Sequence, residues 1–223
     1  MYSRNEKLSL SESGNVIICT PERLDASLAF YPSHSWLNDF ETAIFYDLDL
    51  LLNSVRGNVL EADIIRLSRF NPYVRKILIT TSIENVEHLS VWIKSCLLDY
   101  TEKGQRVYDS NFLTEENVLN QSLIEIVSSG SRTEKELGSF FESSFAHFQG
   151  KETPPVHSVL SVLLGNGLIM KQRNYYPTSL GKVCAGLRLP LTYQLKIISD
   201  LRDGRSPTTL KKHIAEHDAY YRN

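Results

Sequence analysis

Two aspartates, Asp47 and Asp49, follow the apolar run at residues 43–45 and are the first side chains in the sequence that suggest chemistry. Carboxylates at the end of a buried strand are typical ligands of Mg²⁺ in proteins that transfer phosphoryl groups. Side chains two residues apart share one face of a strand, so these two carboxylates would lie together only if the strand continued through both. We interpret both aspartates as solvated and expect no shared metal site.

A zinc-protease pattern occurs near the end of the chain. The residues from His213 to His217 spell H-x-x-E-H, in which two histidines one helical turn apart bind zinc and the glutamate serves as a base. Such a site needs a third protein ligand, which normally comes later in the sequence. Only six residues follow His217. We expect no metal site and no cofactor.

Basic and aromatic residues gather between positions 171 and 182. Lys171, Arg173 and Lys182 flank the pair Tyr175-Tyr176. Lysine and arginine contact phosphates, and tyrosine stacks on unpaired bases, so these five residues are candidates for nucleic-acid binding. In the alternative interpretation, the tyrosines pack against the preceding helix and the cations are solvated. That preceding segment has no lysine or arginine, so recognition of a specific base sequence is not expected.

The elements that position these residues differ between the two halves of the chain. In the first half, short apolar runs at residues 16–19, 43–45 and 77–80 are separated by segments with helical spacing. Strands that alternate with helices predict a parallel sheet, here of three strands. Apolar residues at helical spacing also predict a helix over 86–97, with Asn85 as its N-cap.

The second half has the pattern of three helices followed by a hairpin. Thr133 and Glu136 predict a capping box at the start of a phenylalanine-rich helix. Thr153, with proline after it, predicts the start of the third helix. Residues 168–171 and 175–178 predict the two strands of a β-hairpin, and this order of elements is that of a winged helix.

The expected fold class is α/β plus α+β, with separate domains for the two halves. The expected organisation is an N-terminal segment (1–13), an α/β domain (14–98), a linker (99–112), a winged-helix domain (113–190) and C-terminal helices (191–223), the last of which begins at Ser206.

Several short motifs resemble those of one known family, in the same order. They are T-P-E-R-L-D at 20–25, F-Y-D-L-D at 45–49, R-G-N-V-L-E at 56–61 and T-T-S-I-E-N at 80–85. Together they resemble the latter half of the first RecA-like domain of the Ski-like superfamily 2 DExH helicases. Residues 132–149, 176–182 and 189–192 resemble the winged helix of the HelQ-type DNA repair helicases in that group. The resemblance implies a reduced RecA-like parallel sheet, a winged helix and a truncated helical domain.

The same motifs depart from the family at its ATPase site. Tyr46, Asp47 and Asp49 stand where the family has its metal-binding aspartate, its glutamate and its histidine, and Thr80-Thr81-Ser82 replaces S-A-T. The sequence also lacks the phosphate cradle G-x-x-x-x-G-K-[ST] and has no space for a second motor domain. Phosphoryl transfer depends on positioning and charge neutralisation, so we expect no ATPase activity from this chain alone.

The resemblance also implies that three residues contact nucleic acid. Thr20 and Arg23 belong to the motif at 20–25, and Thr80 opens the motif at 80–85. In the family these positions contact the nucleic-acid backbone. The structural alternative for Thr20 is that it caps the helix beginning at Pro21.

Composition and charge indicate an ordinary globular protein. The 223 residues are 42% hydrophobic and 22% charged, with a formal charge of −2. Residues 1–167 hold 14 basic and 22 acidic residues, whereas 168–223 hold 10 basic and 4 acidic residues, so a charge of −8 is followed by +6. The basic quarter is compatible with a polyanionic partner or with docking on the acidic part of the chain.

Cysteine usage and hydropathy limit the cellular context. Cys19, Cys96 and Cys184 are far apart in sequence and form no C-x-x-C pair, so we expect core cysteines rather than disulfides or a zinc site. No apolar stretch is long enough for a membrane span, and the N-terminus lacks the apolar core of a signal peptide. We expect a cytoplasmic protein with no membrane contact.

The expected function is that of a helicase-like, catalytically inactive module that binds nucleic acid, DNA rather than RNA, or a protein partner. A second hypothesis is one subunit of a split helicase, whose nucleotide cradle and second motor domain come from another chain. A third is a pure protein-interaction module, and a fourth is the remnant of a decayed helicase gene. A half sheet exposes an edge and a face, so a partner or a second copy of the chain is expected to cover it.

Overall fold

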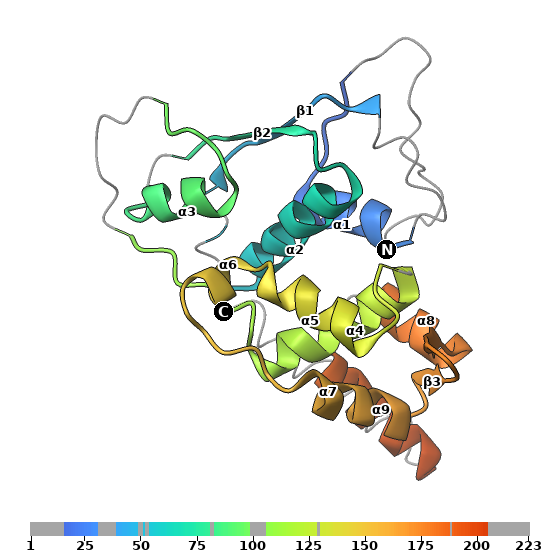
Figure 1. Ribbon diagram of the computed structural model, residues 1–223. Helices are drawn as coiled ribbons and strands as arrows, with labels where there is room; N and C mark the ends of the chain where they lie inside the picture. The colour runs from blue at the N-terminus through green and yellow to red at the C-terminus, as the bar shows by residue number, and fades with distance from the viewer. Residues whose placement is uncertain are drawn as a thin grey trace.

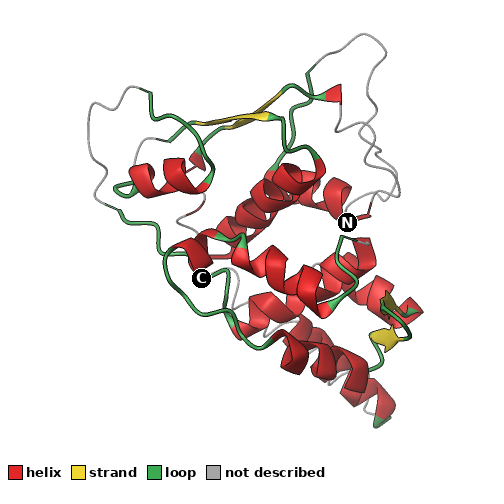
Figure 2. Cartoon of the chain, viewed as in Figure 1, coloured by secondary structure: helices red, strands yellow, loops and turns green. Residues whose placement is uncertain are grey.

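The computed structural model describes residues 16–30, 39–48, 51, 54–80, 83–98, 106–128, 130–187 and 189–204. Figure 1 labels most of the elements, and Figure 2 separates helices from strands by colour. In chain order the elements are α1 (Pro21–Phe30), β1 (Thr42–Phe45), α2 (Ser54–Phe70), β2 (Arg75–Leu78), α3 (Val86–Trp92), α4 (Glu115–Ser128), α5 (Glu134–Glu142), α6 (Phe145–Phe148), α7 (Val156–Gly165), β3 (Ile169–Lys171), β4 (Tyr175–Pro177), α8 (Ser179–Leu187) and α9 (Leu191–Arg202).

The parallel sheet consists of β1 and β2 within the described residues. Thr42 pairs with Arg75 and Phe45 pairs with Leu78. This pairing confirms the two strands predicted around 43–45 and 77–80, with β2 placed two residues earlier than expected. α2 connects the two strands, and Figure 1 shows α1 and α2 together on one side of the sheet.

The prediction of a third strand at residues 16–19 is wrong. These residues belong to no helix or strand, and the side chains of Val16 and Ile18 are 77% and 92% exposed. A β-branched run has the propensity for a strand, but a strand is stabilised only by pairing with a neighbour. The chain instead enters α1 at Pro21. The three-stranded parallel sheet is therefore reduced to the pair β1 and β2 within the described residues.

α3 is shorter than the predicted helix over 86–97. It ends at Trp92, and the backbone of Lys94 turns into the left-handed region with φ of 57°. Asn85 precedes α3 but makes no capping hydrogen bond with its side chain. Its side chain instead pairs with the backbone of Tyr108, donating Nδ2 to the carbonyl oxygen at 2.9 Å and accepting the amide at 2.8 Å. Asn85 therefore fixes a distant segment rather than the helix end.

The helices of the second half follow the local signals closely, with two changes. The capping box of Thr133 and Glu136 is present at the start of α5. The phenylalanine-rich helix divides into α5 and α6, because Ser144 caps a new helix with its own side chain. α7 begins at Val156, after Pro155, so Thr153 is not its N-cap as predicted.

The predicted hairpin is confirmed as the antiparallel pair β3 and β4. Ile169 pairs with Pro177, and Lys171 pairs with Tyr175. The amide of Tyr175 also donates to the carbonyl oxygen of Arg132 at 2.9 Å, which attaches β4 to the segment before α5. α9 confirms the helix expected from Leu191. The helix expected from Ser206 and the H-x-x-E-H motif lie outside the described residues.

Two hydrophobic clusters form the core, and α2 contributes to both. The larger cluster joins Ala62 and Ile65 of α2 with residues of the second half, including Phe140. The smaller cluster lies beneath the sheet and contains Phe45 of β1 and Leu89 of α3. The α/β portion is therefore packed directly on the helices of the second half.

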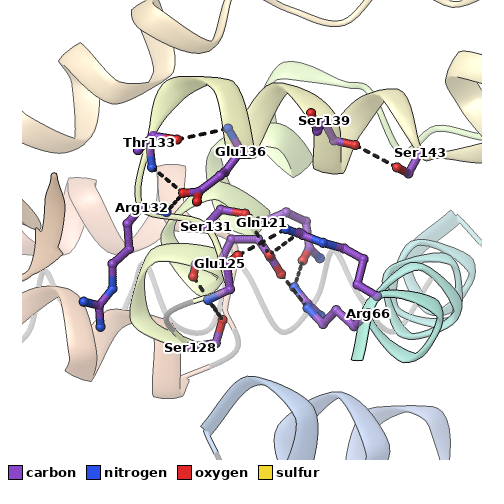
Figure 3. A network of polar contacts seen from close by, with 12 residues as sticks. Arg66, Gln121, Glu125, Ser128, Ser131, Arg132, Thr133, Glu136, Ser139 and Ser143 are labelled. Carbon is purple, nitrogen blue, oxygen red and sulfur yellow. Dashed lines mark hydrogen bonds and ion pairs between the residues drawn. The ribbon is translucent and has the colours of Figure 1, made fainter. Parts of the chain in front are cut away.

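A buried ionic network joins α1, α2 and α4, and Figure 3 shows the part formed by Arg66, Gln121 and Glu125. Arg66 of α2 donates from Nε to Glu125 at 2.7 Å and from Nη2 to Gln121 at 2.6 Å, both in α4. Its Nη1 donates to Asp25 of α1. The side chains of Arg66, Asp25 and Glu125 are each 2% exposed. A buried charge without its partner is strongly unfavourable, so this network restricts how the three helices can pack.

Glu61, the last residue of the R-G-N-V-L-E motif, is a second buried polar centre. Its Oε2 accepts hydrogen bonds from the hydroxyls of Tyr108 at 2.5 Å and Ser110 at 2.6 Å. Its Oε1 accepts the backbone amide of Phe145 at 2.8 Å. Burial raises the pKa of Glu61, and these donors oppose the rise. Glu61 thus ties α2 to the segment over 106–112 and to the start of α6.

The three cysteines lie in different environments. Cys184 is buried in α8, Cys19 is half-buried and Cys96 is exposed. The expectation of core cysteines is therefore right for Cys184 and wrong for Cys96. Burial raises the pKa of the Cys19 and Cys184 thiols. Within the part of the chain that the structure describes, no helix is long and apolar enough to cross a membrane.

Candidate nucleic-acid interface

The hairpin presents exposed cations at its tip. Lys171 ends β3, Arg173 lies in the turn, and both side chains are exposed. The turn is closed by a hydrogen bond from the Gln172 amide to the Asn174 carbonyl oxygen at 3.0 Å. A short turn between two paired strands holds the two cations close together, a spacing that can follow a phosphate backbone.

The two tyrosines of β4 have different environments. Tyr175 is 8% exposed and belongs to the larger hydrophobic cluster, with the ammonium of Lys171 5.3 Å from its ring centroid. The packing alternative therefore holds for Tyr175. Tyr176 is half-buried, and the guanidinium of Arg132 lies 5.1 Å from the centroid of its ring. Of the two rings, that of Tyr176 is the one with surface available for a base.

Lys182 comes to the hairpin from α8, and its side chain is exposed. The hydroxyl of Thr178 donates to the carbonyl oxygen of Gly167 at 2.7 Å and accepts the amide of Gly181 at 3.0 Å. A Cβ atom at Gly181 would lie 2.0 Å from the carbonyl oxygen of Leu168. Glycine thus permits the first turn of α8 to approach the hairpin, which places Lys182 near it.

Arg132 is a member of this surface that the sequence did not single out. Its guanidinium covers Tyr176, and its backbone amide donates to Glu136 at 2.8 Å. The backbone hydrogen bonds to Glu136 are the main cause that lowers the pKa of this carboxyl. The only local signal was its position directly before the capping box, which does not reveal its contact with β4.

The segments around Tyr46 and Thr80, which were compared above with motor motifs, meet at one end of the sheet. The amide of Ile79 donates to the Phe45 carbonyl oxygen and the amide of Leu48 donates to that of Ile79, both at 2.9 Å. This pairing brings Tyr46 and Asp47 to the same end of the sheet as Thr80. Tyr46 is 78% exposed, and Asp47 is exposed with φ of 58°.

No metal-binding cluster occurs at this end of the sheet within the described residues. Groups of three or more potential ligands are absent from that part of the chain. The remaining residues of these motifs, Asp49, Thr81 and Ser82, lie outside it. Figure 1 shows that the sheet lies at the opposite end of the molecule from the hairpin.

Thr20 acts as the cap of α1. Its carbonyl oxygen accepts the amides of Arg23 at 3.1 Å and Leu24 at 3.0 Å, and its hydroxyl accepts the amide of Arg23 at 3.4 Å. The side chain of Arg23 is exposed. In the same turn, Glu22 accepts from Arg56 Nε at 2.6 Å, and this hydrogen bond lowers the pKa of Glu22. The structural alternative is confirmed for Thr20.

No protein family model matches the sequence. The candidate interface is therefore defined by its geometry: a hairpin anchored by the buried Tyr175, with exposed cations on the hairpin and on α8 and the half-buried ring of Tyr176 on β4.

Proposed function

We propose that this chain is a catalytically inactive, helicase-like module that binds nucleic acid through a hairpin surface made of Lys171, Arg173, Tyr176 and Lys182. The observation that carries the proposal is that the hairpin and the helix directly after it present three exposed cations, Lys171 in β3, Arg173 in the turn and Lys182 in α8, while the Tyr176 ring in β4 is only half-buried. Cations displace counterions from phosphates, and a ring offers stacking to any base. DNA is proposed as the preferred polymer, on the resemblance to DNA helicases.

We propose further that the second half is a winged helix. The order of α4, α5, α7, β3 and β4 supports this assignment. So does the hydrogen bond from Tyr175 to Arg132, since it adds an extended segment to the hairpin. The exposed face of α7 offers His157, Ser158 and Ser161 but no cation. Binding is accordingly directed to the backbone rather than to a base sequence.

The absence of ATPase activity is proposed from the residues at the sheet end. Tyr46 stands at the position of the family's metal-binding aspartate, and a phenol is not a ligand that Mg²⁺ prefers. Asp47 is the nearest described carboxylate, but its φ of 58° turns the chain out of the strand at this point. The purified chain is expected to show no Mg·ATP turnover.

The test is fluorescence anisotropy with labelled single-stranded DNA, duplex DNA and single-stranded RNA at about 50 mM salt, where phosphate contacts are strong. The double variant Lys171→Glu with Arg173→Glu should weaken DNA binding at least about tenfold and reduce the slope of log K against log salt by about 2. A matched control, Arg75→Glu with Lys94→Glu, reverses two exposed cations away from the hairpin and should leave binding unchanged.

Two results would overturn the proposal. One is the lack of detectable DNA binding by the wild-type chain at low salt. The other is an equal loss of affinity in both double variants, because that would indicate attraction to net charge rather than to the hairpin. Tighter binding of RNA than of DNA would overturn the preferred polymer while the hairpin surface remained.

A further inference from the structure

A groove runs along β2 and ends at α3. It has a volume of about 890 Å³, and one wall is the continuous run of residues 74–80. Leu89 of α3 and Ile93, directly after α3, line the groove, and residues 94–98 complete it. The volume is within the range of binding sites in proteins, and the lining combines apolar side chains with polar and basic ones. None of the hairpin residues lines this groove.

The wall of the groove includes an open strand edge. Within the described residues β1 is the only neighbour of β2. The amide of Arg75 donates to Glu41, and that of Ile79 donates to Phe45, so odd-numbered residues direct their backbone groups toward β1. Because backbone groups alternate along a strand, those of Lys76 and Leu78 point to the other edge. An open edge of this kind is a template for another strand.

The charge of the groove is of one sign. Arg75, Lys76 and Lys94 line it, and no aspartate or glutamate is among its described lining residues. The ammonium of Lys76 donates to the hydroxyl of Ser68 at 3.1 Å. Burial and the charge of Lys94 both lower the pKa of Lys76, so the two ammonium groups repel each other. A negatively charged occupant would relieve this repulsion.

We infer that this groove binds an extended acidic segment of a partner protein, which adds as a strand to the open edge of β2. The backbone of the segment would pair with Lys76 and Leu78. Apolar side chains on one of its faces would contact Leu89 and Ile93, and acidic side chains would meet Arg75 and Lys94. Main-chain pairing supplies affinity in this mode, and the flanking side chains supply specificity. The inference is independent of the hairpin surface.

The experiment uses a capped peptide of alternating valine and glutamate, about seven residues long to match the wall of the groove. Binding is followed by amide hydrogen exchange of the full chain in NMR spectra. Exchange at Lys76 and Leu78 should slow when the peptide binds. Arg75 and Ile77, which already face β1, should change little. Binding that leaves Lys76 and Leu78 unprotected would overturn strand addition and would indicate a simple anion site.

Variants and a second peptide separate charge from backbone pairing. The variant Arg75→Glu with Lys94→Glu should bind the peptide at least about tenfold more weakly, since two attractive pairs become repulsive. The hairpin variant Lys171→Glu with Arg173→Glu is the matched control and should bind normally. A peptide N-methylated at those alternate residues whose amides would face β2 cannot donate hydrogen bonds to its open edge, and it should not bind. Equal binding of the methylated peptide, or no binding of the first peptide, would refute the inference.

Discussion

Asp63 lies on α2 with no exposed surface, and neither of its carboxyl oxygens has a hydrogen-bond partner among the described residues. Burial raises the pKa of Asp63 well above its ordinary value, Arg66 opposes the rise, and the charge of Glu22 adds to it. The thiol of Cys19 lies close enough for the charge of Asp63 to raise its pKa as well. In the folded chain, Asp63 is therefore expected to stay protonated at pH values at which an exposed aspartate is ionised.

The pH dependence follows from the protons bound in each state. Below about pH 4 both the folded and the unfolded chain hold the proton of Asp63. As the pH rises, the unfolded chain releases this proton near pH 4, whereas the folded chain retains it. The free energy of unfolding then falls by about 1.4 kcal/mol per pH unit until the pKa of the folded state is reached. Asp63 thus destabilises the protein increasingly with pH, the opposite of a paired surface carboxylate.

The substitution Asp63→Asn removes the ionisation and keeps the size of the side chain. Urea denaturation of both proteins, followed by tryptophan fluorescence, should be measured from about pH 5 to pH 8. The variant should gain stability relative to the wild type by about 1.4 kcal/mol per pH unit at the acidic end of this range. The difference should level off at the pKa of the folded state.

The comparison between the two proteins cancels the other titrating groups, because Glu61 and Tyr108 are present in both. An exposed control, Glu142→Gln, should change stability by less than about 0.5 kcal/mol at every pH. A difference between Asp63→Asn and the wild type that does not vary with pH would show that Asp63 ionises normally, and the reasoning from its burial would be wrong.

Three further substitutions test the packing around the candidate surfaces. Arg66→Met should lower the free energy of unfolding by about 3–5 kcal/mol, because it removes the buried cation that Asp25 and Glu125 share, although Glu125 keeps its ion pair with Arg69; a loss below about 1 kcal/mol in urea denaturation would contradict the network. Gly181→Ala should cost about 1–3 kcal/mol by overpacking, whereas Gly186→Ala in the same helix, with nothing within 4 Å of the added Cβ, should not destabilise; calorimetry that finds equal melting temperatures would rule out the close approach. Thr133→Ala should lower stability by about 1 kcal/mol through loss of the capping box, and unchanged thermal unfolding by circular dichroism would disprove this role.

Local patterns in the sequence predicted much of the second half. The capping box of Thr133 involves groups three residues apart, and the hairpin depends on two apolar runs joined by a short polar turn. Such features arise from contacts within one turn of chain, so their energetics are present in the local sequence. The basic and aromatic character of the hairpin was visible for the same reason.

The first half was predicted less well, because its structure depends on distant partners. The run at 16–19 has strand-forming residues but remains unpaired, and Asn85 bonds to Tyr108 instead of capping α3. Whether a strand pairs or a side chain caps is decided by which segment lies beside it. The sequence predicted an exposed sheet edge, but its assignment to β2 and the groove beside it follow from that same tertiary arrangement.

The sequence by itself determined the helices, the hairpin and the charges that the hairpin displays. Only the tertiary structure decided that Glu61, Asp63 and Arg66, three ionisable residues on one helix, are buried. A charged residue predicts exposure unless a partner meets it. For Arg66 those partners are Asp25 and Glu125, which lie far away in the sequence and reach it only when α1, α2 and α4 pack together.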